Sequence, residues 1–466
     1  MASVSGKLIL IVDGYSTGRE LVRELNQRGA ICVHLRSTQQ IPKLAAPCFD
    51  ATPYAANLGY LGTVREALAR LPSVRFDAIV AGSEWGVTYA ESLALALGLP
   101  TNRADTLSAR RNKFDMIDQL RAHRLHAAQQ ARITSADEAH EWARNHGKWP
   151  VVVKPLLSAG SDGVVFCYDH MDIDRAVHAA LYRDNLLGGF NDSLVIQSYL
   201  EGPQYIVNTV SENGMHRVTD AWHVDYRNVR GASNAMCSMT LLDPRAPKIA
   251  ALFDYTKRAI TALGIENGPA HSELRLTEAG PALIETGARL MGGMMNAPSY
   301  AVAGLPTQAS CFADQLVARY RNEPAGRDTY ERPRHFAKVF FVFGEGGHVA
   351  STHGLHRLAK LPSFHAHYRP LEPGARVWRS SDSLFCGGVV YLIHDDPMQI
   401  RMDIAQFRAW EAAHALYAIV PEPVPEAGTA SESASEPNAA AQRIAKQAQP
   451  QTQRKVALAT ESDSAP

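Results

Sequence analysis

The chain has 466 residues and a mass of 50.9 kDa, which is too long for one small core and predicts two or three domains. Lysine plus arginine and aspartate plus glutamate both number 47, so no overall charge favours nucleic acid or a membrane surface as a partner. Any site for phosphate must therefore be local.

The cysteines and the first residues indicate the compartment. Six cysteines are scattered without a CxxC pair, which fits a reduced compartment and argues against structural zinc. Only a five-residue apolar run precedes Asp13, which is too short for a secretory signal and reads as a buried strand. No run approaches the length of a transmembrane helix. We therefore expect a cytoplasmic protein.

The first hundred residues alternate between predicted strands and helices. Residues 7 to 13 predict a strand, and capping-box patterns at residues 17 to 20 and 63 to 66 predict the starts of two helices. Another strand, FDAIVAG, and a helix ending in LALALGLP continue the alternation, which predicts an α/β domain with a mostly parallel sheet. The run GYSTG does not match the dinucleotide-binding pattern of glycines, so a nicotinamide or flavin cofactor gains little support.

The next segment combines a lysine with a glycine-rich loop. Predicted helices at 108 to 123 and 135 to 145 lead into KWPVVVKPLLSAGSDGVVF, where three valines form a short buried strand that ends at Lys154. Glycines and serines between two strands make a loop whose backbone N–H groups can close over phosphates. The lysine adds a positive charge at the base of that loop. The alternative is a plain hairpin with a flexible tip.

A kinked connection follows. SLVIQSYLEGPQYIVNTV predicts a strand, a bend at residues 200 to 203 and a second strand. A nucleotide base could lie beside such a connection and use its backbone groups as partners for the edge of adenine.

Two glutamates lie on adjacent strands of a predicted hairpin, HSELRLTEAGPALIETGARLMGG. Alternation places Leu274 and Leu276 toward a core and His271, Glu273 and Arg275 on the other face.

Pairing these strands around the turn at residues 278 to 281 brings Glu273 and Glu285 close together, with Arg289 just beyond. Hard oxygen ligands of this kind suit Mg2+ bridging nucleotide phosphates, with Mn2+ as the alternative ion. The other interpretation is a solvated hairpin face that carries ordinary surface glutamates.

The C-terminal part predicts a mixed segment from 335 to 420 with a last helix at 398 to 418. Residues 421 to 466 are rich in Pro, Ala, Ser, Glu and Gln and cannot bury enough apolar surface to offset their ordering entropy, so we expect a disordered tail.

Together these segments resemble the ATP-grasp superfamily, and within it the carboxylate–amine ligases that include L-amino acid ligases and carnosine-synthase-like enzymes. The resemblance spans roughly residues 7 to 420. The run at 82 to 102, RRNKF, VVVKP, the glycine loop, the strand pair around Gly202 and the ExxxR run ending at Arg289 occur in the family's order.

The resemblance implies an α/β fold in four parts. A Rossmann-like pre-ATP-grasp domain would occupy residues 1–105, and a central ATP-binding lid domain residues 106–205. A C-terminal ATP-grasp and substrate domain, with a mixed α+β lobe, would occupy residues 206–420, followed by the tail at 421–466.

It also implies which residues contact the nucleotide. Lys113 and Lys154 match lysines that contact ATP phosphates. The loop that folds over the β- and γ-phosphates would carry Ser158, Gly160, Ser161 and Gly163. Gln197, with the backbone of Ser198 and Leu200, matches the adenine-binding hinge, and Gln204 stands where the family has a residue for the ribose.

The remaining site residues concern the chemistry. Glu273 and Glu285 match the metal-binding carboxylates, and Arg289 matches the arginine that steadies the transferred phosphoryl group. His271 shares a strand face with Glu273 and is a candidate to orient the attacking amine or accept its proton. Its alternative role is a structural hydrogen-bond donor.

Two positions depart from the family pattern. The family commonly has asparagine two positions after the second metal carboxylate, where this chain has Gly287. A glutamate usually holds the ribose where this chain has Gln204, with Glu201 nearby. Metal number or nucleotide affinity is expected to differ accordingly.

The resemblance implies an ATP-dependent ligase that joins two L-amino acids into a dipeptide through an acyl phosphate and releases ADP and phosphate. One alternative is ligation of a non-amino-acid carboxylate to an amine in secondary metabolism, and another is a non-catalytic nucleotide-binding protein. The expected partners are amino acids, with no nucleic acid and no membrane. A homodimer follows only from the resemblance.

Overall fold

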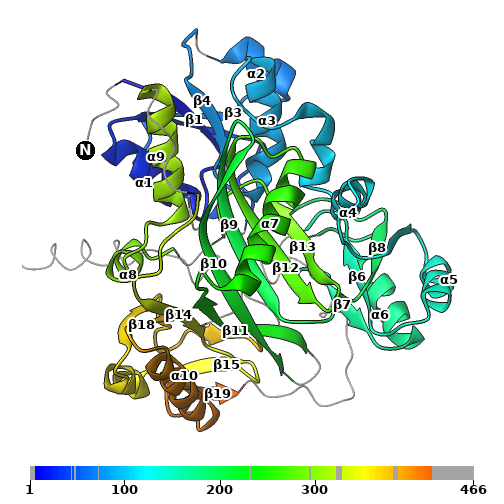
Figure 1. The fold of residues 1–466 in the computed structure, drawn as a ribbon, viewed down its shortest axis with the longest axis vertical. Helices are drawn as coiled ribbons and strands as arrows, with labels where there is room; N and C mark the ends of the chain where they lie inside the picture. The colour runs from blue at the N-terminus through cyan, green and yellow to red at the C-terminus, as the bar shows by residue number, and fades with distance from the viewer. Residues whose placement is uncertain are drawn as a thin grey trace, which may run out of the picture.

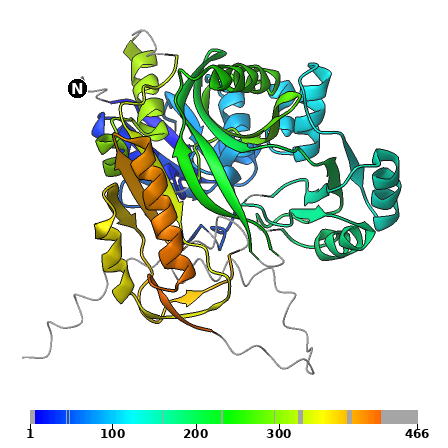
Figure 2. The same ribbon diagram turned by 60° about the horizontal axis from the view of Figure 1, so that its bottom comes forward.

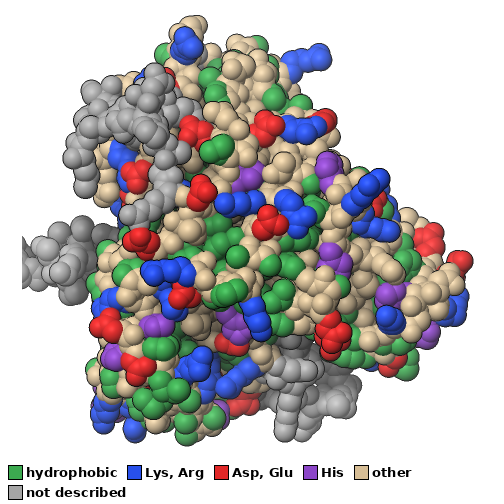
Figure 3. Space-filling view, viewed as in Figure 1, with side chains coloured by type: hydrophobic (Ala, Val, Ile, Leu, Met, Phe, Trp, Pro, Cys, Tyr) green, Lys and Arg blue, Asp and Glu red, His purple; other side chains and the backbone are tan. Residues whose placement is uncertain are grey.

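The computed structural model describes residues 6–43, 45–46, 49–71, 73–158, 160–185, 187–229, 232–292, 295–321, 328–380 and 387–421. The tail predicted to be disordered lies outside these residues, apart from Pro421. Across the described ranges, no helix is long and apolar enough to cross a membrane. On the face drawn in Figure 3, basic and acidic side chains are interspersed.

The N-terminal part is a parallel sheet covered by helices (Figure 1, blue), as the alternating pattern predicted. Its strand order is β3-β2-β1-β4. Leu10, Val12 and Leu35 are fully buried in the layer between the sheet and its helices. The strands are β1 (Leu8–Val12), β2 (Ile31–Arg36), β3 (Ala56–Tyr60) and β4 (Ala78–Ala81), and the helices are α1 (Gly18–Gln27), α2 (Val64–Arg70), α3 (Val87–Ala96) and the short 3-10 turn η2 (Glu84–Gly86).

Only one of the two predicted capping boxes forms. At α2, the hydroxyl of Thr63 accepts from the Glu66 N–H at 3.4 Å, and the Glu66 carboxylate accepts from the Thr63 N–H at 2.7 Å. The box predicted at residues 17 to 20 is wrong. Thr17 already has helical backbone angles, with φ −73°, and its side chain makes no cap bond, whereas Glu20 pairs with Arg23.

The second part is a small antiparallel sheet in the order β5-β8-β6-β7 (cyan in Figure 1), which we call the lid sheet. The helix predicted at 135 to 145 is confirmed: Ser135 caps it, and Gly147 ends it with φ 69°. The helix predicted at 108 to 123 is divided because Asn112 leaves helical geometry and caps a new helix. The elements are η3 (Ala104–Thr106), η4 (Ser108–Arg110), α4 (Lys113–Ala122), β5 (Gln130–Ile133), α5 (Ala136–His146), β6 (Val151–Pro155), β7 (Val165–Cys167), α6 (His170–Ala180) and β8 (Leu194–Ser198).

The third part is built on a large sheet of eight described strands in the order β13-β12-β9-β10-β11-β14-β18-β16 (Figures 1 and 2). Its strands are β9 (Gln204–Glu212), β10 (Met215–Val229), β11 (Ala232–Leu241), β12 (Gly268–Thr277), β13 (Gly280–Gly287), β14 (His335–Phe340), β16 (Phe364–Tyr368) and β18 (Val389–His394). Its helices are α7 (Pro247–Ala262), α8 (Ala297–Val302), α9 (Gln308–Arg321), η5 (His353–Lys360) and α10 (Pro397–Ala412).

A small sheet, β17-β15-β19, closes the C-terminal end; its strands are β15 (Gly347–Ser351), β17 (Arg376–Val377) and β19 (Ala418–Pro421). The last predicted helix, 398 to 418, is therefore too long. The helix ends at Ala412 because His414 adopts a left-handed backbone with φ 52°, after which the chain pairs as β19.

The N-terminal sheet and the large sheet share one hydrophobic core, to which α4 also contributes, whereas the lid sheet has its own core with α5 and α6. Helix α9 packs beside α1, where Arg28 donates to Asp314 at 2.8 Å and to the hydroxyl of Ser310 at 2.9 Å (Figure 1). The first and third parts therefore form one packed body, and the lid joins it through α4, which precedes β5, and through the connection between β8 and β9.

Candidate active site

The two predicted metal carboxylates lie opposite each other. Strands β12 and β13 are antiparallel with Glu273 paired to Glu285, which confirms the predicted register of the hairpin. Leu274 is fully buried, as alternation predicted. An irregularity between Glu273 and Leu274 shifts the register afterwards, and Leu276 is only half-buried.

Two lysines approach Glu285 from other parts of the chain. Lys113, in the first turn of α4, places Nζ 3.1 Å from a carboxylate oxygen of Glu285 and donates to the Ser158 carbonyl at 2.7 Å. Lys154, on β6, is only 4% exposed. Burial lowers the pKa of Lys154 to about 8, against an opposing attraction from Glu285.

Glu285 keeps its negative charge although burial disfavours an ionised carboxylate. Burial alone would raise its pKa, but Lys113 and Lys154 hold the pKa below the ordinary value. An ionised carboxylate beside two lysines is suited to share a cation with a polyphosphate.

The glycine-rich loop joins β6 to β7, which pair as a hairpin. Gly160, Ser161 and Gly163 have left-handed backbone, with φ 65°, 63° and 68°. Such conformations turn backbone N–H groups into a concavity that can bind an anion. The Ser158 hydroxyl anchors the base of the loop by donating to Asp162 at 2.7 Å.

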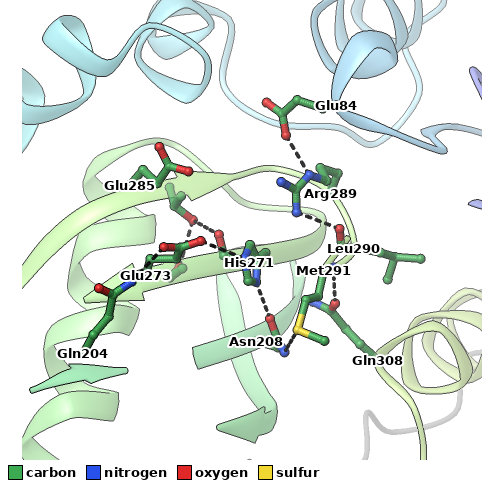
Figure 4. Close-up of polar contacts among 12 residues, drawn as sticks. Glu84, Gln204, Asn208, His271, Glu273, Glu285, Arg289, Leu290, Met291 and Gln308 are labelled. Atoms are coloured by element: carbon green, nitrogen blue, oxygen red, sulfur yellow. Dashed lines mark hydrogen bonds and ion pairs between the residues drawn. The ribbon is translucent and has the colours of Figure 1, made fainter. Parts of the chain in front are cut away.

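Glu273 is held from the neighbouring strand (Figure 4). The Gln204 side chain donates to one carboxylate oxygen at 3.0 Å, and it also donates to the Tyr226 hydroxyl at 2.9 Å. His271 lies on the other side, with Nε2 3.4 Å from the second oxygen. The structure therefore brings Gln204, His271, Glu273 and Glu285 together.

The residues predicted to contact adenine lie in the lid sheet and in the connection that follows β8. The Gln197 side chain donates to that of Gln130 at 2.8 Å, and the Ser198 N–H donates to the Gln129 carbonyl at 2.9 Å. These contacts place Gln197 and Ser198 within the sheet. Leu200 lies in the connection that follows, between β8 and β9.

That connection, residues 199 to 203, is fixed to the strand that carries Glu273. Arg275 donates to the Gly202 carbonyl at 2.6 Å and lies over the ring of Tyr199. The Leu276 N–H donates to the Pro203 carbonyl at 3.0 Å. The position of the lid is thus coupled to the β12 strand.

Arg289 meets a residue that the sequence analysis did not single out. Its Nε donates to Glu84 at 2.6 Å, and Glu84 also pairs with Arg111. Burial would raise the pKa of Glu84, but Arg111, then Arg289 and Lys113, lower it to about 2. The sequence contained a signal for Glu84, because it follows shortly after β4, which ends at Ala81, and the carboxyl ends of parallel strands are where ligands gather.

Gly287 lies against this ion pair. A Cβ atom at position 287 would lie 3.0 Å from a Glu84 oxygen and 3.4 Å from the Arg289 guanidinium carbon. The space for a side chain at 287 is therefore taken by Glu84 and Arg289.

The donor set fits a nucleotide triphosphate with a divalent cation. Two facing carboxylates supply oxygen ligands, and two lysines with an anion-binding loop supply contacts for phosphates. Within the described part of the chain, no group of three or more His, Cys, Asp or Glu side chains could hold a metal ion together. Phosphate oxygens and water would complete the coordination, as Mg2+ commonly requires.

Comparison with known proteins agrees with this geometry. Residues 147–297 match the ATP-grasp domain family. The chain is 29% identical over 415 residues to dapdiamide A synthase of Enterobacter agglomerans, which covers 87% of this chain and 96% of that protein.

Solved structures show the same fold. An L-amino acid ligase from Bacillus licheniformis matches 90% of this chain and all of its own, with a TM-score of 0.65 at 17% identity. A carboxyaminoimidazole ribonucleotide synthase from Aspergillus clavatus complexed with ATP covers 87% of this chain and 98% of its own, with a TM-score of 0.62 at 14% identity. The predicted ATP-grasp fold is confirmed.

Proposed function

Because this chain belongs to the ATP-grasp superfamily and has the fold of its carboxylate–amine ligases, we propose that it joins two L-amino acids into a dipeptide at the expense of ATP. The observation that carries the proposal is the facing pair of Glu273 and Glu285 with Lys113 and Lys154 beside it.

In the first step, a carboxylate oxygen of one amino acid attacks the γ-phosphorus of ATP. The bond from that phosphorus to the bridging oxygen breaks, giving an acyl phosphate and ADP. Lys113, Lys154 and the loop N–H groups neutralise the charge that moves onto the bridging oxygen and the transferred group. Glu273 and Glu285 would hold Mg2+, which would supply further charge neutralisation.

In the second step, the amine of the other amino acid attacks the acyl carbon. The C–N bond forms, phosphate leaves, and the amine proton must move to a base. His271 Nε2, 3.4 Å from Glu273, is the candidate that the geometry favours. Arg289 is the candidate to steady the phosphoryl group.

A second candidate function is ligation of a non-amino-acid carboxylate to an amine in secondary metabolism. The specific observation in its favour is the similarity to dapdiamide A synthase over most of both chains.

A third candidate is nucleotide binding without catalysis, which Gly287 and Gln204 suggested. Glu84 and Arg289 fill the space that a side chain at position 287 would need. The glycine is therefore explained by packing, and it gives little support to a protein without catalytic activity.

The remaining expectations are part of the proposal. We propose the division at 1–105, 106–205, 206–420 and 421–466, supported by the three main sheets and the connection at 199 to 203. The buried free thiols of Cys32, Cys167, Cys237 and Cys311 fit the expected cytoplasmic location. Amino acids as partners and a homodimer stay predictions.

The test incubates purified protein with ATP, Mg2+ and pooled L-amino acids, and follows phosphate release together with mass spectrometry. Phosphate with a new dipeptide mass supports the proposal, and Glu285→Gln should abolish both. Phosphate with a different adduct, after pooled carboxylic acids are added, would favour the second candidate. ATP binding without phosphate release in either screen would favour the third.

A further inference from the structure

A buried polar chain leads away from Glu273 into the large sheet (Figure 4). His271 Nδ1 lies 2.9 Å from the side-chain oxygen of Asn208, on the neighbouring strand β9. The Asn208 amide nitrogen lies 2.6 Å from Asp220 on β10 and 3.4 Å from the sulfur of Met291. Asn208 is fully buried and Asp220 is 1% exposed, so water does not compete for these contacts.

The neighbours of Asn208 determine which end of its amide faces which way. A carboxylate accepts hydrogen bonds, and so does a thioether sulfur. Two acceptors, Asp220 and Met291, therefore surround one end of the amide, and only the NH2 group can satisfy both. The oxygen must face His271, and an oxygen at 2.9 Å requires a proton on His271 Nδ1.

Asp220 is itself held as an acceptor. The indole N–H of Trp222 donates to the same oxygen that Asn208 uses, and the Thr219 hydroxyl donates to the other at 3.1 Å. The fully buried Lys338 lies 4.1 Å from the Trp222 ring. Burial lowers the pKa of Lys338 to about 7, and attraction to Asp220 opposes this lowering.

We propose that Asp220 is a positioning residue: it orients the Asn208 amide, which keeps the proton of His271 on Nδ1 and points the lone pair of Nε2 toward the reacting groups beside Glu273. Asp220 does this from inside the sheet, two side chains away from His271. Nδ1 carries a proton whether the ring is neutral or charged, so the assignment does not depend on how His271 titrates.

This arrangement has a consequence for the ligase reaction, and to that extent it rests on the proposed function. With Nδ1 protonated and fixed by Asn208, the neutral ring can accept a proton only at Nε2. Nε2 is the nitrogen that faces Glu273. The amine proton released in the second step would move to that atom, and a ring with the opposite tautomer could not take it there.

The test is nuclear magnetic resonance of the full, ligand-free chain labelled with 15N-histidine, which does not depend on ligase activity. The chain has 18 histidines, and His271 is assigned by the loss of its signals in His271→Gln. At alkaline pH, couplings to the two ring hydrogens separate Nδ1 from Nε2. The expected pattern is a protonated Nδ1 and a bare Nε2. A bare Nδ1 in the unaltered protein would overturn the proposal without any variant.

Asp220→Ala provides the second arm, because it removes the oxygen that accepts from both Asn208 and the indole N–H of Trp222. The indole N–H is then free to donate to the oxygen of a reversed Asn208 amide. We expect part or all of His271 to change tautomer. The matched control is Asp403→Ala, since Asp403 is another buried carboxylate, held by Ser363 and Gln399 in a separate core, and this change should leave the His271 signals unaltered. Unchanged His271 signals in folded Asp220→Ala would contradict the proposal.

Steady-state kinetics distinguish a loss of His271 positioning from disruption of the whole active site. Asp220→Ala should lower kcat about 10- to 100-fold while the KM for ATP stays near that of the unaltered protein. A parallel loss of ATP affinity would indicate damage to the whole site. If no substrate pair gives turnover, the ligase proposal fails, whereas the tautomer result still decides the role of Asp220.

Discussion

Lys154 places an ammonium group in a buried position, and its pKa of about 8 lies well below that of a free lysine. Bound phosphates favour the charged form, so the pKa in the complex must be higher than in the free protein. ATP affinity should therefore be highest below pH 8 and fall by up to about tenfold per pH unit above it. Binding near pH 8 should take up a proton, measurable by titration calorimetry in buffers of different ionisation enthalpy.

The control for this prediction removes the titrating group. Lys154→Met should bind ATP more weakly and without the proton uptake. Lys257→Met, on α7 and outside the site, should keep the uptake of the unaltered protein. Equal proton uptake in Lys154→Met would show that another group is responsible.

Glu84 links the N-terminal sheet to Arg289. Glu84→Gln removes the negative charge that holds Arg111 and Arg289 together, leaving two guanidinium groups with no shared anionic partner. A shift of Arg289 by about 1 Å would misplace the contact to the transferred phosphoryl group, so we expect kcat/KM to fall about 100-fold in the phosphate-release assay. Asp105→Asn breaks an exposed pair with Arg103 and should change little. Similar rates for both variants would exclude this role for Glu84.

At the residue scale, the sequence predicts which residues face each other within one hairpin. Alternation and a turn were enough to pair Glu273 with Glu285 because both lie on adjacent strands. The partners of Arg289 and His271 could not be predicted in this way. Glu84, Asn208 and Asp220 reach the site from elements whose positions depend on packing of the whole chain.

Among the elements, the connection between the lid and the large sheet is the most sensitive to substitution. Gly202 has φ 130°, and a Cβ there would lie 2.2 Å from the Leu276 carbonyl oxygen. Gly202→Ala should therefore lower the melting temperature and weaken ATP binding, because the connection must move away from β12. Gly214→Ala is the matched control, since Gly214 also has positive φ, 78°, but no atom within 4 Å of the added Cβ.

Gly214→Ala should show only the cost of a left-handed backbone, about 1 to 2 kcal/mol, with unchanged ATP affinity. Equal effects of the two substitutions would mean that the contact between Gly202 and Leu276 does not position the lid.

Element ends show where local patterns decide structure and where they do not. The same capping-box pattern forms at Thr63 and fails at Thr17, because the backbone before α1 is already helical. The last helix was overextended because the left-handed turn at His414 gives no sequence signal comparable to glycine. Strand and helix type were predictable in both regions, and the ends depended on tertiary context.

For the whole molecule, the last described strand is β19, which ends at Pro421. Strand β19 pairs with β15, with Pro421 opposite Gly347. Deletion of residues 422 to 466 should leave ligase activity and melting temperature unchanged. Deletion from residue 418 onward also removes β19 and should lower the melting temperature. Loss of activity in the shorter deletion would show that the tail contributes to function.

The order of the motifs was sufficient to predict the ATP-grasp fold. Several of them, such as VVVKP and the glycine loop, mark the end of a strand or a loop between strands. The shared core of the N-terminal and large sheets was not predictable, since it depends on contacts such as α1 with α9 that carry no local pattern. This shared core is what places Glu84 opposite Arg289.

The most direct test of an ATP-dependent ligase uses a carboxylate substrate labelled with 18O in its carboxyl group, once the screen has identified it. Attack on the γ-phosphorus followed by loss of phosphate to the amine transfers one carboxyl oxygen to phosphate. We predict one 18O atom in each phosphate released, measured by mass spectrometry, and no release in Glu285→Gln. Phosphate without 18O would mean that water attacks ATP, and it would contradict the acyl-phosphate mechanism.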